Sequence, residues 1–446
     1  MIDAHLTSMS VIAIVAVIAM YSLLITEKIN KVLVVGVTAF LLILLQVFKA
    51  QNAGSQEQAF TFVARNLDVL GFVIGMMVLV GIVKESGFFE AIAIWLVKKV
   101  KGNPKLLLLA LGYLTLVMTA FLSNIPTILI LTPVILVLIE ELKLPYLPFF
   151  ITLITMANIG GATTPISDPT TYYQAKTAGL SFMEVVSNSG FLVIILSVVS
   201  MIYMQLVFRK QLSKVHIKEK AIAAYKPASA IKNKKILYAG VPLLVLTVLI
   251  LLTKDAISHA TGMTLDNASI ALLASCIAIL LFKVDIKTVL QHIVDWEIIF
   301  FFMGLFIVIG SLEYTGVVKA LAGVLVTLSH GNNIALQFLI TMGSSILSVF
   351  IDNVPYNITM VSAIQAMGKA GIAIYPLWWG LNLGTSLGGA GSPIGAACNV
   401  VALGQAEKEK IHIKFLKYLA YGFPLVIING LVTFVVLYIR YNLLQH

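Results

Sequence analysis

Residues 157–171 read ANIGGATTPISDPTT, and residues 385–400 read TSLGGAGSPIGAACNV. Each stretch places a glycine pair, hydroxyl side chains and a proline inside a long apolar segment. Backbone polar groups in a bilayer must be satisfied internally, so a broken helix is tolerated only where protein or a water-filled cavity surrounds it. The two stretches therefore predict interrupted helices, within residues 144–175 and 370–406, in a membrane protein.

The composition of the whole chain indicates a bilayer environment. Hydrophobic residues make up 59% of the 446 residues and charged residues 11%, against about 45–50% and about 25% in soluble domains. The net charge of +10 does not indicate nucleic-acid binding, because the basic residues lie in short loops between apolar segments, where they set membrane topology. Phosphate-binding loops and hydrolase motifs are missing from the sequence, which favours a transporter over an enzyme.

The apolar segments differ in length. A helix needs about 20 apolar residues to cross a bilayer. Residues 106–139 and 331–368 are too long for one crossing and too short for two, so we predict re-entrant hairpins that turn near Ser123 and Asp352. Residues 88–101 and 317–330 predict interfacial arm helices. Simple spans are predicted at residues 10–26, 31–48, 68–86, 189–208, 236–253, 267–282, 296–312 and 422–439.

The broken segments recur at a nearly constant spacing. Asn124 and Asn353 are 229 positions apart, and the glycine pairs 160–161 and 388–389 are 228 apart. Chance recurrence of glycine and proline is the alternative, but the shared order and spacing favour an internal duplication, which is a hallmark of secondary transporters. The predicted organisation is a first transporter repeat with two leading helices (1–208), a basic linker (209–235) and a second, inverted repeat (236–446).

The distribution of basic residues predicts the topology. The linker contains nine lysines and arginines, and loops rich in these residues stay in the cytoplasm. With the linker inside, 23 of the 30 basic residues lie on the cytoplasmic side and both termini lie outside. Each half then has about five crossings and one hairpin. We expect a multi-pass protein of the plasma (inner) membrane, with the lipid bilayer as its main partner and no nucleic-acid partner.

The polar residues at the four breaks are the candidate ion and substrate ligands. Asp168 and Asp352 are carboxylates at membrane depth and are the candidate coupling groups, although Asp168 fits an N-cap of a helix restarting at Pro169 equally well. A proline kink with capping residues is the alternative at the hairpins. Short oxygen-bearing side chains suit sodium, so Ser123, Asn124, Asp352 and Asn353 predict a sodium site, and no other cofactor is expected. The full candidate set is Ser123, Asn124, Thr127, Asn158, Gly160, Gly161, Thr163, Thr164, Asp168, Asp352, Asn353, Asn357, Thr385, Ser386, Gly388, Gly389, Ser392 and Asn399.

These motifs resemble those of the ion transporter superfamily. Phe121–Pro133, Asn158–Pro169, Asp352–Pro355 and Leu387–Val400 carry the resemblance, which covers most of the chain from about Asp68. The nearest branch holds the melanosomal P protein, arsenite-efflux pumps and type D sodium/proton antiporters, with citrate carriers further off. The resemblance implies an elevator-type transporter with a scaffold and a moving domain, ions held at the hairpin tips and interrupted helices, and in many members a homodimer. A soluble ATPase partner is implied only for an arsenite pump.

The chain departs from that family pattern at two positions. Ser123 stands where P-protein-like members have an aspartate, and Ala390 stands where an asparagine is usual. The sequence thus predicts a secondary active transporter of a small ion, coupled to sodium or protons. An anion of the arsenite, oxyanion or carboxylate class is favoured, because the broken helices are rich in hydroxyls and lack a deep lysine or arginine. A sodium/proton antiporter is the alternative, and an ion channel is a more distant one.

Overall fold

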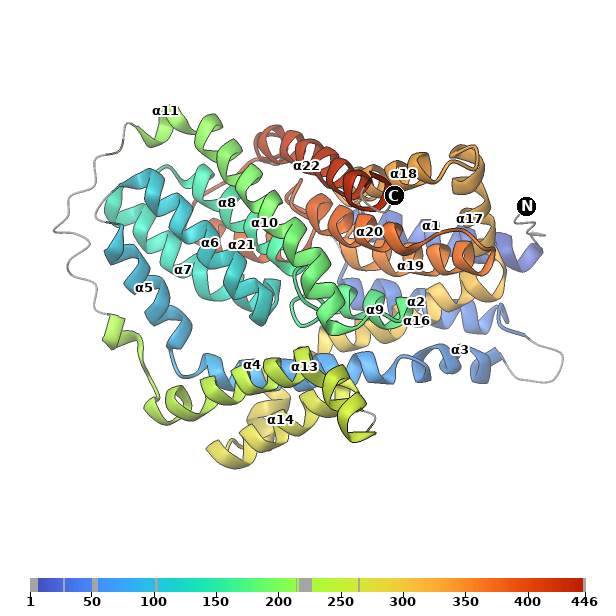
Figure 1. Ribbon diagram of the computed structural model, residues 1–446, viewed down its shortest axis with the longest axis horizontal. Coiled ribbons are helices and arrows are strands. Elements are labelled where there is room, and N and C mark those ends of the chain that lie inside the picture. The colour runs from blue at the N-terminus through green and yellow to red at the C-terminus, as the bar shows by residue number, and fades with distance from the viewer. Residues whose placement is uncertain are drawn as a thin grey trace.

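The computed structural model describes residues 7–26, 29–49, 55–100, 103–213, 215, 227–263 and 265–443. Across these ranges, helices are the only regular secondary structure (Figure 1). The predicted all-α fold is therefore confirmed. Seven of the described helices are long and apolar enough to cross a membrane, which supports the prediction of a polytopic membrane protein.

In the described part of the first half, ten helices precede the linker. Each predicted span, arm and break has a counterpart among them, and α3 is an addition that the sequence did not predict. Their bounds are α1 (Ser8–Thr26), α2 (Lys31–Leu44), α3 (Ser55–Ala64), α4 (Leu67–Lys84), α5 (Phe88–Lys99), α6 (Pro104–Leu122), α7 (Asn124–Leu142), α8 (Tyr146–Gly161), α9 (Pro169–Ala178) and α10 (Phe182–Val207).

The second half repeats the order of α4 to α10: a long helix, a short arm, a hairpin, an interrupted helix and a final long helix. Before this series come the short α11 (Arg209–Leu212) and two leading helices. The bounds are α13 (Val241–Thr261), α14 (Asn267–Phe282), α15 (Ile286–Thr288), α16 (Trp296–Tyr314), α17 (Val317–Leu328), α18 (Asn333–Leu347), α19 (Asn353–Lys369), α20 (Tyr375–Gly389), α21 (Ala397–Lys408) and α22 (Phe415–Tyr438), with single π-helical turns at Ile236–Gly240, Val289–Ile293 and Ile439–Leu443.

Corresponding helices of the two halves begin at residues of the same type. The side chain of Asn103 accepts hydrogen bonds from the first amides of α6, and Asn332, 229 positions later, does the same for α18. An asparagine at this position satisfies amides that have no partner within the helix. Gly87 and Gly316 precede the two arms with φ of 76° and 78°, a conformation that glycine adopts without a steric penalty.

The predicted spans differ in length from the observed helices. Five of the eight correspond to long apolar helices, whereas the spans predicted at 10–26, 31–48 and 267–282 correspond to shorter ones. In the first hairpin the two helices, α6 and α7, have 19 residues each, or about 28 Å. These helices are longer than predicted because they continue past the uncharged segment, to Pro104 and Leu142.

We call α6 to α10 with α18 to α22 the central body. Two groups of helices flank it: α1, α2 and α16 form one, and α4, α13 and α14 form the other, and we call the two groups together the frame. In the frame, α2 packs on α16 and α14 packs on α4, so each half supplies a leading helix to the other half. In the central body, α6 packs on α8 and α18 packs on α20, and the halves meet where α7 contacts α21, α9 contacts α19 and α8 contacts α20. The hairpins of the two halves lie toward opposite ends of the long axis (Figure 1).

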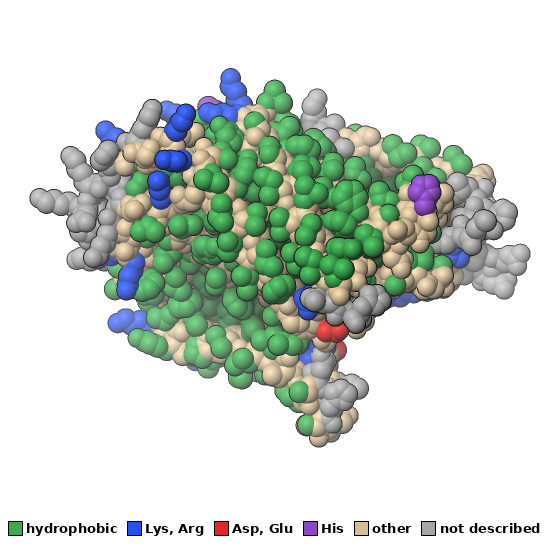
Figure 2. All heavy atoms as spheres, turned by 45° about the horizontal axis from the view of Figure 1, so that its top comes forward, with side chains coloured by type: hydrophobic (Ala, Val, Ile, Leu, Met, Phe, Trp, Pro, Cys, Tyr) green, Lys and Arg blue, Asp and Glu red, His purple; other side chains and the backbone are tan. Residues whose placement is uncertain are grey.

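The surface has the character of a bilayer-embedded protein. Figure 2 shows hydrophobic side chains over the middle of one face and most of the visible lysines and arginines at one end. On α10, Ile194 is 64% exposed and Leu206 is 67% exposed. Aliphatic side chains exposed along a long helix are expected where lipid is the solvent.

The linker is described only in part. Four of its nine basic residues, Lys214, Lys218, Lys220 and Lys226, lie outside the described residues. Where the linker is described, it docks onto the turn between α4 and α5: the Lys232 amide donates to the Ser86 carbonyl at 2.9 Å. The cytoplasmic location of the linker and the boundaries of the two repeats stay predictions.

Candidate ion site at the broken helices

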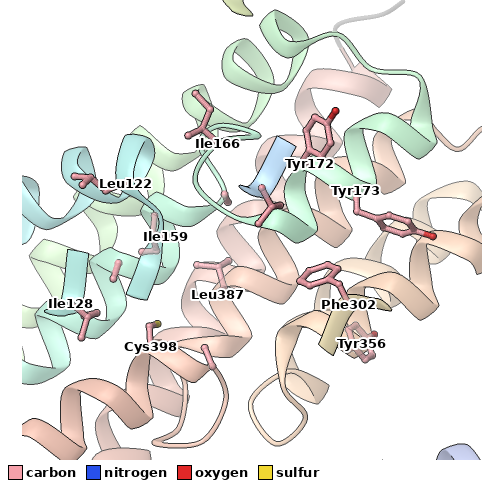
Figure 3. Close-up of a cluster of buried hydrophobic side chains, with 14 of the residues drawn as sticks. Leu122, Ile128, Ile159, Ile166, Tyr172, Tyr173, Phe302, Tyr356, Leu387 and Cys398 are labelled. Carbon is pink, nitrogen blue, oxygen red and sulfur yellow. The ribbon is translucent and has the colours of Figure 1, made fainter. Parts of the chain in front are cut away.

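The four predicted breaks are present. The first hairpin turns at Ser123, where φ is 69° and which separates α6 from α7. The second turns over residues 348–352, between α18 and α19. The interrupted helices break over residues 162–168 and 390–396. The breaks in the interrupted helices are mostly buried, whereas the hairpin turns are partly exposed, with Phe350 42% exposed. Figure 3 shows Leu122, Ile159 and Leu387, which flank these breaks in the chain, in one cluster of buried hydrophobic side chains.

The glycine pairs permit close packing of each hairpin on its interrupted helix. A Cβ atom at Gly160 would lie 2.7 Å from the Leu116 carbonyl oxygen, and one at Gly388 would lie 2.5 Å from the Ser345 carbonyl oxygen. Leu116 and Ser345 are themselves 229 positions apart. The same backbone contact is therefore made in both halves, and only a residue without a side chain fits it.

Two predicted ligands fasten the breaks to the hairpins. The Thr164 hydroxyl donates to the Ala120 carbonyl at 2.6 Å, and the Ser392 hydroxyl donates to the Val349 carbonyl at 2.5 Å. Both donors and acceptors are buried. Because Ala120 and Val349 have lost part of their helical pairing at the hairpin ends, these bonds satisfy carbonyls that would otherwise lack a partner.

Two further hydrogen bonds join the halves at the breaks. Asn158 on α8 donates to the Asn399 side chain on α21 at 3.0 Å, and Thr171 on α9 donates to the Asn382 side chain on α20 at 2.9 Å. Asn399 and Thr171 occupy equivalent positions in the two halves. Each also donates to the last carbonyl of its own first half-helix, Asn399 to Gly389 at 2.6 Å and Thr171 to Gly161 at 3.4 Å.

Asp168 lies in the first interrupted helix and is 4% exposed. Its side chain caps α9, accepting from the Thr170 amide at 2.9 Å and from the Thr170 hydroxyl at 2.7 Å. The Asn124 side-chain amide, from the tip of the first hairpin, donates to its other oxygen at 3.5 Å. These three partners are uncharged. Asp168 is therefore an N-cap, and its carboxylate also faces the hairpin tip.

Asp352, at the tip of the second hairpin, has a charged partner. It caps α19 by accepting from the Val354 amide at 3.1 Å, and its second oxygen binds the Lys31 ammonium at 2.7 Å. Lys31 lies 321 positions before Asp352 in the chain. The sequence around the breaks therefore did not predict this ion pair.

Several buried oxygen atoms at the breaks have no hydrogen-bond partner among the residues that the structure describes. They are the side-chain carbonyl oxygens of Asn124, Asn158 and Asn357 and the hydroxyl of Thr163. A Cβ atom at Gly161 would lie 2.5 Å from the Asn124 oxygen, so this oxygen points at the end of α8. Buried polar atoms are normally paired, and unpaired oxygens beside a carboxylate are the ligands that sodium and calcium prefer.

The helix N-termini at the breaks fall into two classes. Asp168 caps α9 and Asp352 caps α19, whereas α7 and α21 have no side-chain cap. The capped helices α9 and α19 contact each other, and so do the uncapped helices α7 and α21. Ile128 of α7 and Cys398 of α21 are both labelled in the lower left part of Figure 3. A helix N-terminus carries a partial positive charge. The uncapped pair thus favours an anion, and the aspartate-capped pair favours a cation.

The other predicted residues lie at or beside the breaks. Asn357 donates to Gln174 and Thr385, each at 3.3 Å, and Thr127 donates to the Ser123 carbonyl at 2.8 Å. Asn353 and Ser386 are buried in the first turn of α19 and the last turn of α20. Gln174 was not predicted as a site residue, because a single glutamine within a helix has no motif that marks it.

The second half of the interrupted helix, α9, borders the frame. Tyr172 stacks on Phe72 of α4 with ring centroids 4.1 Å apart, and Tyr173 lies 5.5 Å from Phe306 of α16. On the same helix, Lys176 binds Asp68 of α4 at 2.5 Å. The frame therefore contacts the central body through aromatic rings and a few polar bridges next to the site.

Comparisons with known proteins agree with this architecture. A family model described as "Citrate transporter" (CitMHS) matches residues 21–384. An uncharacterized transporter of Mycobacterium tuberculosis is 30% identical, over 98% of this chain and all of its own. The human P protein is 26% identical over 82% of this chain and 52% of its own.

A solved structure has the same fold. The YdaH transporter of Alcanivorax borkumensis superposes with a TM-score of 0.62 at 15% identity, over 98% of this chain and 99% of its own. The predicted superfamily and the prediction of a transporter rather than an enzyme are confirmed. With most of its length matched by one family model, this chain belongs to the citrate transporter (CitMHS) family.

Proposed function

We propose that this protein is a secondary active transporter of a small organic anion of the carboxylate class, driven by sodium or protons. Membership of the citrate transporter family supports the anion. The observation that carries the coupling is the environment of Asp168: a buried carboxylate with uncharged partners, beside Asn124, whose side-chain oxygen is unpaired. A buried carboxylate without a counter-ion is costly, so binding a cation or proton there is favourable.

The anion in this proposal binds near the uncapped ends of α7 and α21. A cation beside Asp168 adds a positive charge on the adjacent capped side. Each ion then improves the electrostatic environment of the other, and by linkage the coupling is reciprocal. Cation and anion are expected to move together.

The proposed motion is a displacement of the central body against the frame. Packing is more extensive within the central body, and within each of the two helix groups of the frame, than between frame and body. Each hairpin is fastened to its interrupted helix by the glycine contacts and the Thr164 and Ser392 hydrogen bonds. The site would then travel as one body, as in an elevator-type transporter. The plasma-membrane location, the inside linker and the outside termini belong to the same proposal, as does a homodimer.

A sodium/proton antiporter is the second candidate. The presence of two aspartates at the broken helices, Asp168 and Asp352, favours it, because carboxylates can bind sodium and protons in turn. Arsenite or another oxyanion is a third candidate substrate, and the experiment below includes arsenite.

The test uses purified protein in liposomes. Uptake of labelled citrate, succinate and arsenite is measured under an inward sodium gradient, an inward proton gradient and neither, with protein-free liposomes as the control. We expect uptake of a carboxylate only with a cation gradient. Sodium-driven proton efflux without any added anion, followed with an internal pH dye, would instead establish the antiporter and refute the anion proposal.

A further inference from the structure

We propose that Lys31 is a tethered counter-ion: it occupies the cation position at Asp352 and holds the central body to the frame until a mobile cation replaces it. This inference rests on the proposed function and assigns a role to a residue outside the broken helices. The ion pair joins the first residue of α2 to the residue that caps α19.

The pair crosses the boundary between the frame and the central body. Lys31 begins α2, which packs on α1 and α16 in the frame. Asp352 precedes α19, which packs on α9 and α20 in the central body. Any movement of the body relative to the frame changes the distance between them, so an intact pair resists the movement.

The geometry allows the lysine to leave and the carboxylate to stay. The Asp352 side chain is 13% exposed, whereas Lys31 is 41% exposed. The lysine therefore reaches a largely covered carboxylate from a partly hydrated position on a flexible stem. The other Asp352 oxygen accepts from the Val354 amide, so the helix cap keeps the carboxylate in place after the ammonium departs.

The two halves of the site differ because of this lysine. Asp352 corresponds to Ser123 in the first half, and Asp168 corresponds to Ala396 in the second, so each half has one aspartate. Asp168 has uncharged partners, whereas Asp352 has an ammonium. One carboxylate is thus open to a mobile cation, and the other is already neutralised by the protein.

Competition follows from charge. An ammonium and a sodium ion or proton cannot both bind the same carboxylate oxygen favourably, so the mobile cation must displace Lys31. The charged groups involved are Lys31, Asp352, Asp168 and Glu297, which accepts from Asn30 beside the start of α2. If the lysine occupies Asp352 about nine-tenths of the time, removing it raises the apparent cation affinity about tenfold.

The experiment is a cation titration of purified protein in detergent. Thermal stabilisation is followed against sodium, with choline maintaining ionic strength, and against pH at fixed sodium. The variants are Lys31→Met, Lys31→Arg, which keeps the charge, and Lys176→Met, which removes a second ion pair between frame and body. Lys31→Gln serves as a second neutral variant in case Lys31→Met folds poorly.

We expect Lys31→Met to need about tenfold less sodium, or a proton concentration about tenfold lower, for half-maximal stabilisation. Lys31→Arg and Lys176→Met should resemble the wild type, and adding Asp352→Asn to Lys31→Met should abolish the gain. Unchanged cation dependence in both neutral variants, or an equal shift in Lys176→Met, would overturn the inference. Because the readout is binding rather than uptake, failure of the transport proposal is seen separately, in the liposome assay of the wild type.

Discussion

A methyl group added at Gly388 tests the packing of the second hairpin on its interrupted helix. The new Cβ atom of Gly388→Ala would lie 2.5 Å from the Ser345 carbonyl oxygen and 2.6 Å from the Ser348 Cβ atom. Carbon atoms in contact lie about 3.5–4.0 Å apart, so the hairpin must move by roughly 1 Å. Both neighbours are backbone or Cβ atoms and have no rotamer that relieves the clash.

The free-energy change has two opposing parts. Overpacking a well-packed site costs about 1–3 kcal/mol, whereas replacing a helical glycine by alanine contributes about 0.5–1 kcal/mol of stability. The difference is a net destabilisation of about 0–2.5 kcal/mol, with a midpoint of about 1 kcal/mol. Gly160→Ala should behave alike, because its Cβ atom would lie 2.7 Å from the Leu116 carbonyl oxygen.

The assay is the thermal denaturation of the purified variants in one detergent, followed by intrinsic fluorescence. Gly404→Ala is the matched control: it is also helical, and nothing lies within 4 Å of its added Cβ atom. The control should be more stable than the wild type, and Gly160→Ala and Gly388→Ala less stable. If Gly388→Ala shifted the midpoint in the same direction as Gly404→Ala, the close approach would be refuted.

Three further predictions use the same denaturation assay. Thr164→Val and Ser392→Ala should each lower stability by about 1–3 kcal/mol, because each leaves a buried hairpin carbonyl without a donor. The control Thr327→Val, at an exposed helical hydroxyl, should change stability little. Equal losses in all three variants would contradict the role given to the Thr164 and Ser392 hydrogen bonds. Asn399→Leu should cost more than either, since it deprives two buried carbonyls and Asn158 of their partner; a loss below that of Ser392→Ala would count against it. Lys176→Met should cost less than about 1 kcal/mol because its ion pair is partly exposed, and a larger loss that persists in high salt would show a different role.

The sequence predicted the elements of the fold because membrane helices have simple signals. Long apolar segments marked the crossings, and glycine, proline and asparagine at spacings of 228 and 229 marked the hairpins and breaks. The short helix α3 was not predicted, since its sequence Ser55–Ala64 is neither long nor apolar. The predicted ends of the first hairpin, residues 106 and 139, were wrong because its two helices extend into charged residues such as Lys105 and Glu141.

The candidate site was predictable as a set of residues but not as a set of contacts. Spacing identified Thr164 and Ser392, but only the fold shows that their hydroxyls bind hairpin carbonyls. Nothing local relates Lys31 to Asp352, because their contact depends on how the frame packs against the body. Contacts between residues hundreds of positions apart are set by tertiary packing, which a single sequence does not encode in any short pattern.

The measurement that tests the central claim most directly is the accumulation ratio of the transported anion in liposomes with wild-type protein and with Asp168→Asn. The wild type should concentrate the anion inside above its outside level for as long as the cation gradient lasts. Asp168→Asn should retain binding and exchange of the anion but give a ratio of about one. A wild-type ratio of one under every cation gradient, or an undiminished ratio in Asp168→Asn, would contradict the account.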